Sequence, residues 1–344
     1  MNSILQQYGP QFQNASLEVI SGGLINQTWK VTAKGKNFIL QRINDNVFKE
    51  PQKIATKIRL LADHLTAIRS DYFLVSAIKT ESGEELAHET GKGYFRLTPF
   101  IENSKTIHVV ETPEHAYEAA LQFGRFSSTF SDFDARQLHV TIPNFHDLAY
   151  RYKQFENALL TGNPQRVSAC SNEIDQIRSY AHLVDEYNRT LRNPVFKLRV
   201  THHDTKISNV LFDLNNKGVC VIDLDTVMPG YFFSDVGDMM RTYLSPTNEE
   251  ETDFSKILVR PMFYHAIVQG YSEGMKDALS IEEQESFFLA GQFLIYMQAL
   301  RFLTDYLNND VYYGAQFEGQ NLTRAQNQLS LFSAFVRAKN SLEI

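Results

Sequence analysis

Thr201-His202-His203-Asp204-Thr205-Lys206-Ile207-Ser208-Asn209, followed by Val221-Ile222-Asp223-Leu224-Asp225, is the stretch of sequence that decides the fold. Short apolar runs at 210–212 and 219–222 flank a polar turn at 213–218. Two such runs around a turn of this kind predict a β-hairpin. The hairpin brings the two polar segments together, and a loop in this position can present polar groups into a cleft.

The residue types in these segments point to phosphoryl transfer. Four residues separate Asp204 from Asn209, which is the spacing of the kinase catalytic loop H-x-D-x-x-x-x-N. Asp204 can orient an acceptor hydroxyl and take its proton. Asn209 and Asp223, helped by Asp225, offer the hard oxygen ligands that Mg²⁺ prefers. Lys206 can neutralise negative charge that develops on the transferring group.

Two other interpretations of these residues are weaker. Asp204 and Asp223 could serve only as turn or cap residues, but that does not explain why both follow apolar strands at kinase spacing. His202-His203-Asp204 also spells the HD dyad of metal phosphohydrolases, which requires a helix. A strand signal follows here instead, which argues against that class of enzyme. We expect His202 to brace the loop by hydrogen bonds rather than act as a base.

The order of the predicted elements indicates an α+β chain of two lobes. Strand signals and one helix fill the first hundred residues, with strands near 17–20, 29–31, 38–40, 74–78, Leu86 and 94–99 and the helix at 51–69. Helical spacing dominates afterwards, at 113–126, 146–160, 171–191, 255–275 and 281–307, with a short strand signal at 196–200. We therefore predict a protein-kinase-like fold with a small β-rich lobe over 1–101 and a larger helical lobe over 102–344.

A nucleotide would bind between these lobes. The glycine turn Ser21-Gly22-Gly23-Leu24-Ile25-Asn26 lies between two strand signals, where backbone N–H groups can approach phosphates; an ordinary hairpin turn is the alternative. Gln41 occupies the strand position where kinases carry a lysine, so the usual Lys–Glu pair is missing and Arg42 is expected to help hold the phosphates. Adenine is expected against 98–102. The candidate nucleotide-binding residues are Ser21, Gly22, Gly23, Asn26, Gln41, Phe100, Ile101 and Lys206.

These motifs resemble the aminoglycoside phosphotransferase and choline kinase family, and within it the N-acetylhexosamine 1-kinases. The likeness is most specific from 200 to 230 and continues at 235–241 and 301–312. It implies ATP and Mg²⁺ as cofactors and the anomeric hydroxyl of an N-acetylhexosamine as acceptor. It also implies that Asp204 is the catalytic base, that Asn209 and Asp223 bind the metal, and that Arg301 and Tyr312 contact the sugar.

The acceptor site departs from that family at two positions. Leu24 stands where the sugar kinases have a histidine that contacts the sugar, and Thr242 stands where they have an aromatic residue, with Tyr243 next. Both bear on which sugar fits, because sites built to hydrogen-bond a hydroxyl discriminate strongly. An alternative role for Arg301 is a helix-surface ion pair with Asp305, four residues on.

Composition limits the partners. The chain has 344 residues and a net charge of −7, so a nucleic-acid binder, which needs excess clustered lysine and arginine, is not expected. No apolar run reaches the roughly 20 residues of a membrane span, and Cys170 and Cys220 form no disulfide framework. A cytoplasmic enzyme is expected, while the oligomeric state stays open. The competing hypotheses are a kinase for choline, an amino alcohol or an aminoglycoside, and a catalytically silent binding module, suggested by Gln41.

Overall fold

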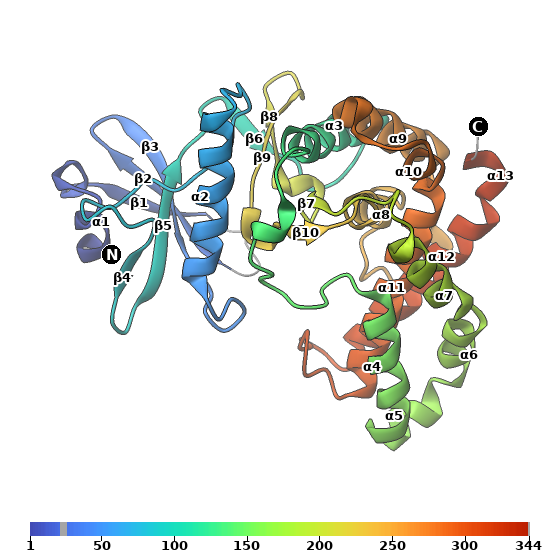
Figure 1. The fold of residues 1–344 in the computed structure, drawn as a ribbon. Coiled ribbons are helices and arrows are strands. Elements are labelled where there is room, and N and C mark those ends of the chain that lie inside the picture. The colour runs from blue at the N-terminus through green and yellow to red at the C-terminus, as the bar shows by residue number, and fades with distance from the viewer. Residues whose placement is uncertain (21–25, 343–344) are drawn as a thin grey trace.

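The computed structural model describes residues 1–20 and 26–342, which form two lobes (Figure 1). The N-terminal lobe is built on an antiparallel sheet with the strand order β1-β2-β3-β5-β4. A tight turn between β2 and β3 is possible because Lys34 and Gly35 adopt positive φ angles of 49° and 75°. The elements of this lobe are α1 (Asn2–Gln6), β1 (Ser16–Ile20), β2 (Gln27–Ala33), β3 (Lys36–Arg42), α2 (Pro51–Ala67), β4 (Ala87–Glu89) and β5 (Gly93–Pro99).

The two faces of this sheet have different roles. Leu40 of β3 and Leu97 of β5 are paired in register and fully buried in a small core with α1. Side chains of a strand alternate between faces, so Ile39 and Gln41 point the other way and line a cleft between the lobes. The sheet therefore carries a core on one side and a binding surface on the other.

The predicted strand at 74–78 is wrong. This segment is extended but forms no ladder, and Ile78 makes a single bond to β5, from its N–H to Leu97 O at 2.7 Å. β4 pairs with β5 over residues 93–95, and the segment at 74–78 meets the same edge at Leu97, near the end of β5 at Pro99. The strand predicted around Leu86 therefore forms as β4, whereas the overlap of 74–78 with β5 is too short for a ladder.

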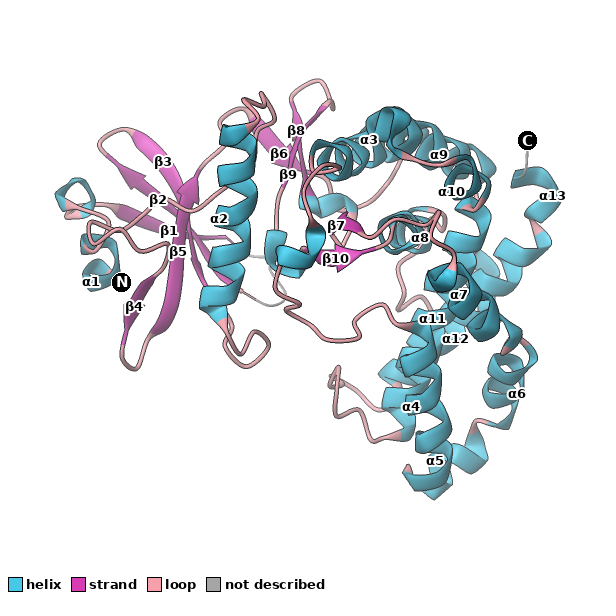
Figure 2. Ribbon diagram, viewed as in Figure 1, coloured by secondary structure: helices cyan, strands magenta, loops and turns pink. Residues whose placement is uncertain are grey.

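The C-terminal lobe is helical, with short strands at its boundary with the first lobe (Figure 2). The predicted hairpin is confirmed as β8 and β9, and β6 adds to it as a third antiparallel strand. The elements are β6 (Ser104–Thr106), α3 (Pro113–Thr129), α4 (Leu148–Thr161), α5 (Pro164–Ala169), α6 (Ser171–Ser179), α7 (His182–Arg192), β7 (Arg199–Thr201), β8 (Val210–Asp213), β9 (Gly218–Val221), β10 (Met228–Gly230), α8 (Phe232–Tyr243), α9 (Pro261–Met275), α10 (Ile281–Glu285), α11 (Phe287–Leu307), α12 (Gln320–Arg337) and α13 (Lys339–Leu342).

Several predicted helices are shorter or divided. The helix predicted over 255–275 begins at Pro261, because the residue before a proline avoids the helical region. The one over 281–307 is interrupted at Ser286. Its first part begins with a capping box between Ser280 and Glu283. The one over 171–191 is interrupted at 180–181, and the predicted strand at 196–200 forms only from Arg199.

The larger hydrophobic core crosses the predicted lobe boundary at residue 101. Ile54, Ile58, Leu61 and Leu65 of α2 belong to the same cluster as the buried residues of α3, α8 and α11. Helix α11 is long and apolar enough to span a membrane by length and composition, but 83% of that window is buried inside the protein. It is the central core helix of the C-terminal lobe, and the boundary at 101 stays a prediction.

Gly230 permits a close contact with the loop 201–209. A Cβ on Gly230 would lie 2.5 Å from His203 Nε2, and the His203 ring is buried. We expect Gly230→Ala to lower the free energy of unfolding by about 1–3 kcal/mol, the usual cost of overpacking, as measured by chemical denaturation. The double variant Gly230→Ala with His203→Ala should lose less free energy of unfolding than the sum of the losses in the two single variants. Strictly additive losses would contradict the contact.

Candidate active site

Helix α8 holds the loop that contains Asp204. Asp235, fully buried, accepts hydrogen bonds from the N–H groups of His202 at 3.0 Å and His203 at 2.7 Å. Burial raises the pKa of Asp235 to about 7, although these two bonds lower it. Asp238 accepts from the N–H of Thr205 at 2.8 Å. Asp235 and Asp238 thus brace this loop from α8.

His202 is a structural residue, as predicted. Its Nε2 lies 3.0 Å from Ile222 O, and its Nδ1 accepts a bond from the N–H of Asp204 at 3.3 Å. Burial lowers the pKa of His202 to about 4, so the ring is neutral near pH 7. It donates from Nε2 and accepts at Nδ1, which ties the loop to the end of β9.

His203 does not form a metal dyad with Asp204. Its Nδ1 lies 3.1 Å from Thr201 O, its φ is 66°, and its ring packs against the ring of His146 at 5.4 Å. Across residues 1–20 and 26–342, no group of three or more histidine, cysteine or acidic side chains is arranged to hold a metal ion. The phosphohydrolase interpretation of this sequence therefore finds no support.

Asp204, Lys206 and Asn209 form a contact cluster in the cleft. Lys206 Nζ lies 3.1 Å from Asp204 Oδ2, and Asn209 Nδ2 donates to the same oxygen at 3.0 Å. Burial would raise the pKa of Asp204, but Lys206 and then His202, with the hydrogen bonds to Lys206 and Asn209, keep it below its ordinary value. Asp204 is therefore an ionised carboxylate near neutral pH.

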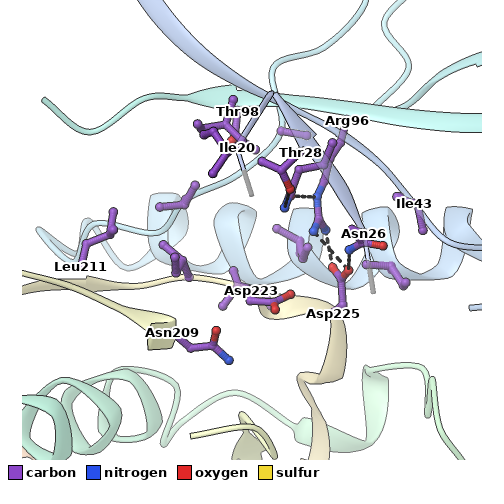
Figure 3. Close-up of a pocket in the computed structure, with 18 of the residues that line it drawn as sticks. Ile20, Asn26, Thr28, Ile43, Arg96, Thr98, Asn209, Leu211, Asp223 and Asp225 are labelled. Atoms are coloured by element: carbon purple, nitrogen blue, oxygen red, sulfur yellow. Dashed lines mark hydrogen bonds and ion pairs between the residues drawn. The ribbon is translucent and has the colours of Figure 1, made fainter. Parts of the chain in front are cut away.

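Asp223 faces the same space from the end of the hairpin (Figure 3). Its φ of 59° marks a sharp bend after β9, and Ile222 just before it donates from its N–H to Asn209 O at 2.8 Å. Burial, and then the carboxylates of Asp225 and Asp204, raise the pKa of Asp223 to about 6. This excess of negative charge is what a bound cation would relieve.

Asn209 and Asp223 fit a magnesium ion by their chemistry. Because the amide nitrogen of Asn209 is turned to Asp204, its oxygen is available for a cation. An amide oxygen and a carboxylate are hard ligands, and Mg²⁺ commonly takes only one or two protein ligands, with water and substrate phosphates completing its shell.

Asp225 does not share this role. Arg96 of β5 contacts both of its oxygens, Oδ2 at 3.1 Å, and Asn26 donates to Oδ2 at 2.8 Å (Figure 3). The side chains of Arg96 and Asp225 are 7% and 2% exposed. With both oxygens engaged in a buried ion pair, Asp225 is removed from the expected metal ligands and becomes a link between the lobes.

Gln41 orients the arginine of that pair. Its Oε1 accepts from Arg96 Nε at 2.8 Å, and its Nε2 donates to Thr28 at 3.2 Å. The predicted absence of the Lys–Glu pair is thus accompanied by an Arg–Asp pair built from other elements. Arg42 lies on the opposite face of the sheet and donates to Lys92 O at 2.7 Å, so the expectation that it holds phosphates is wrong.

The cleft between the lobes has a volume of about 570 Å³, within the range of small-molecule sites. The expected nucleotide-binding residues Gln41, Phe100, Ile101 and Lys206 all line it, as does Asn26. Asn26 also accepts from the N–H of Asn44 at 3.0 Å, which fixes its amide. Ser21, Gly22, Gly23 and Leu24, predicted to contact nucleotide or sugar, lie outside the described residues.

The residues expected to contact a sugar do not all lie in one place. Arg301 and Tyr312 line a second cavity between α4 and α11. Thr242 does not join them, because its hydroxyl donates back to Asp238 O at 2.7 Å within α8. Tyr243 is fully buried with its hydroxyl on Thr205 O. It supports the catalytic loop, so the aromatic residue after Thr242 cannot replace a sugar contact.

Sequence reasoning missed Lys57 and Arg96, although both carried a signal. Lys57 lies three residues after Ile54 and four before Leu61, so it occupies the apolar face of α2. Arg96 stands between Phe95 and Leu97 in a strand. A charge within an apolar pattern predicts a buried partner, but the pattern does not say which one.

Lys57 is fully buried and donates to Asp225 O at 2.6 Å and Thr141 Oγ1 at 3.1 Å. Burial lowers its pKa from 10.5 to about 7. The unfolded chain therefore holds this proton up to about pH 10 while the folded chain releases it near pH 7, so Lys57 makes stability rise with pH across this window, with a slope of up to about 1.4 kcal/mol per pH unit.

Lys57→Met should remove that slope between pH 7 and pH 10, as measured by urea denaturation at each pH. Lys53→Met, one turn earlier in α2 where the side chain is 43% exposed, is the matched control and should keep the wild-type slope. Parallel curves for Lys57→Met and the wild type would contradict a depressed pKa.

Comparison with known proteins agrees with this geometry. The sequence profile of the phosphotransferase enzyme family matches residues 16–279. The chain belongs to the phosphotransferase enzyme family. The matched region of this phosphotransferase includes the cleft, the hairpin and the whole catalytic loop.

Solved structures share the fold of this phosphotransferase over nearly its whole length. An aminoglycoside phosphotransferase from Alicyclobacillus acidocaldarius has 12% identity and a TM-score of 0.64, covering 99% of this chain and 96% of that one. A choline kinase from Cryptosporidium parvum has 13% identity and a TM-score of 0.56, covering 99% and 95%. A spectinomycin phosphotransferase in complex with ADP and spectinomycin has 13% identity and a TM-score of 0.56, covering 93% of each chain. The predicted protein-kinase-like α+β fold is confirmed.

Proposed function

We propose that this phosphotransferase transfers the γ-phosphoryl group of ATP to a sugar hydroxyl, the anomeric hydroxyl of an N-acetylhexosamine or a related hexose. The observation that carries the proposal is the contact cluster of Asp204, Lys206 and Asn209 in the cleft, with Asp223 beside it. That combination provides an ionised base, a cation and hard metal ligands in one place.

ATP would lie in the cleft between the lobes, with adenine near Phe100 and Ile101. The shared fold of the spectinomycin phosphotransferase that holds ADP supports this placement. Lys206 is close enough to Asp204 to act on a phosphoryl group that approaches the acceptor. Its positive charge would offset the charge that develops on the transferring group.

Magnesium would be held by Asn209 and Asp223. When bound, the ion would supply charge neutralisation on the nucleotide phosphates. Asn209 keeps its oxygen free for this role by donating its amide hydrogen to Asp204. The same bond holds the Asp204 carboxylate in place to accept the proton of the acceptor hydroxyl.

The positive charge of the cavity that contains Arg301 favours a sugar over the competing acceptors. Arg301, which the family resemblance assigns to the sugar, shares its cavity with Arg151 and Lys153. Choline and aminoglycosides are cations, and like charges repel at short range. An aminoglycoside site would instead require an acidic rim, and choline an aromatic cage free of competing cations.

A catalytically silent binding module is the alternative from another class. It was suggested by Gln41, but Gln41 orients Arg96 and the Asp204 cluster is complete, so we favour an active enzyme. We further propose a cytoplasmic setting, because Cys170 and Cys220 are both free and buried and thiols persist where the medium is reducing.

The test is ADP release with ATP and Mg²⁺ against a panel of N-acetylhexosamines, neutral hexoses, choline, amino alcohols and aminoglycosides. We expect turnover with a sugar only, and a ³¹P spectrum of the product that shows an anomeric phosphate. Turnover with choline or an antibiotic instead would reject the sugar. Nucleotide binding without any ADP release across the panel would favour the silent module.

A further inference from the structure

The second cavity, between α4 and α11, contains two buried arginines. Its volume is about 390 Å³, which is in the range of small-molecule pockets. Arg151 comes from α4 and Arg301 from α11, and they are 7% and 8% exposed. Buried charges are normally paired with an opposite charge, so the partners of these two decide what the cavity is for.

Arg151 has only neutral partners. It donates to Gln154 Oε1 at 2.9 Å and to Phe145 O at 3.3 Å. Its Nε is buried with no hydrogen-bond partner. A guanidinium has five N–H donors, so most of the hydrogen-bonding capacity of Arg151 is unused.

Arg301 is in the same situation. It donates to Gln298 Oε1 at 3.0 Å and lies 3.5 Å from Tyr312 Oη, and its Nε also lacks a partner. Among the residues that the structure describes, neither Arg301 nor Arg151 forms an ion pair with a carboxylate. Beside the exposed Lys153, the cavity therefore carries two buried positive charges without an ion-pair partner among the described residues.

Asp305, which lines the same cavity, does not supply the missing charge. Its carboxylate accepts from the N–H groups of Tyr312 at 2.7 Å and Tyr313 at 2.9 Å, and from Asn321 at 3.1 Å. The ion pair considered for Arg301 with Asp305 is therefore not formed. Asp305 is used to shape the loop after α11.

Aromatic rings stabilise the two guanidinium groups in part. The ring of Tyr312 lies 5.9 Å from the Arg151 guanidinium carbon and 5.8 Å from that of Arg301. Such contacts contribute about 0.5–2 kcal/mol each, but they leave the charge in place. Burial, and then repulsion from Arg301, lower the pKa of Arg151.

We propose that Arg151 and Arg301 together bind an anionic oxygen group, a carboxylate or a phosphate, carried by the acceptor. The preferred acceptor is then an acidic sugar rather than a neutral hexosamine. The inference deepens the proposed function and rests on it for the identity of the reaction. Two guanidinium forks match a planar carboxylate or a phosphate in geometry as well as in charge.

An acceptor that binds at the two arginines must also reach the catalytic loop, and Phe145 lies between these two sites. The Arg301 guanidinium carbon is 5.1 Å from the ring of Phe145, and that ring is 6.4 Å from the ring of His203. His203 directly precedes Asp204 in the chain. Phe145, whose ring stacks on the ring of His146 at 4.5 Å, therefore connects the anion site to the residue before the expected base.

The experiment compares three acceptors on the same ring: a neutral N-acetylhexosamine, the corresponding uronic acid and the corresponding 6-phosphate. We expect at least one anionic acceptor to have a kcat/KM about tenfold or more above the neutral one, with an advantage that shrinks as KCl is raised. Comparison of the uronic acid with the 6-phosphate identifies which anion is recognised. A neutral acceptor that matches or exceeds both anionic ones would overturn the inference.

Variants test the two arginines directly. Arg151→Leu should lower kcat/KM for the anionic acceptor at least tenfold more than for the neutral one, and Arg151→Lys should restore part of that difference. Arg189→Leu, an exposed arginine on α7, should leave the preference unchanged. An equal loss for all three acceptors in a folded Arg151→Leu protein would count against the inference.

Failure of the proposed function can be distinguished from failure of the anion site. If no sugar is phosphorylated, calorimetric binding of the same three compounds to the wild-type protein applies the same criterion. Tighter binding of an anionic compound would then uphold the anion site without the reaction, and equal binding of all three would reject it.

Discussion

Asp204→Asn is expected to lower kcat by about 10²–10⁴-fold, the usual contribution of a positioned general base. The amide has nearly the shape of the carboxylate and can still accept a bond from Lys206, so the loop should keep its conformation. It cannot take a proton from the acceptor hydroxyl. ATP binding, measured by calorimetry, and the denaturation midpoint should stay near the wild-type values.

The control for this experiment is Asp175→Asn, which makes the same chemical change on the exposed face of α6 and should leave kcat unchanged. Loss of ATP binding in Asp204→Asn together with kcat would point to a structural role for the carboxylate. Unchanged kcat with a folded protein would remove Asp204 from the mechanism and, with it, the proposed base.

Local patterns predicted the catalytic loop well because its parts are close in the sequence. Asp204 and Asn209 are five positions apart and contact each other, and the hairpin that follows returns Asp223 to them. The spacing of polar residues around two short strands was enough to bring these groups together. Asp235 lies in the stretch 235–241 that carries part of the family resemblance, and its bonds to His202 and His203 hold this loop on α8.

Long-range partners could not be predicted in the same way. Lys57 contacts Asp225, 168 positions away, and nothing in the local pattern of α2 identifies that partner. Arg151 lies on the apolar face of α4 between Leu148 and Phe155, so its burial was readable from helical spacing. Its position in the same cavity as Arg301 depends on how α4 packs on α11.

The predicted strand at 74–78 failed for a related reason. Its apolar residues have the composition of a strand, but a strand forms only where a neighbour offers free backbone groups. β4 pairs with residues 93–95 of β5, and within 74–78 only the N–H of Ile78 finds a partner on β5, at Leu97 O. How far a segment runs beside a neighbouring strand is not visible in the segment alone.

The second large effect is expected at the ion pair between the lobes. Arg96→Met leaves the buried carboxylate of Asp225 without its main positive partner, which typically costs about 3–5 kcal/mol of stability. Lys57, which lies beside Asp225, would offset part of that cost. Nucleotide affinity should fall as well, because the pair joins β5 to the loop after β9. Denaturation by urea and calorimetry with an ATP analogue measure the two effects.

Two further variants separate the pair from the loss of a side chain. Arg96→Met combined with Asp225→Leu removes both charges, and its loss of stability should be smaller than the sum of the single losses, since a buried pair replaced by apolar groups costs little. Arg136→Met breaks an exposed ion pair with Asp134, and no measurable change is expected because water screens exposed charges. If Arg96→Met also causes no measurable loss of stability, the Arg96–Asp225 contact does not link the lobes.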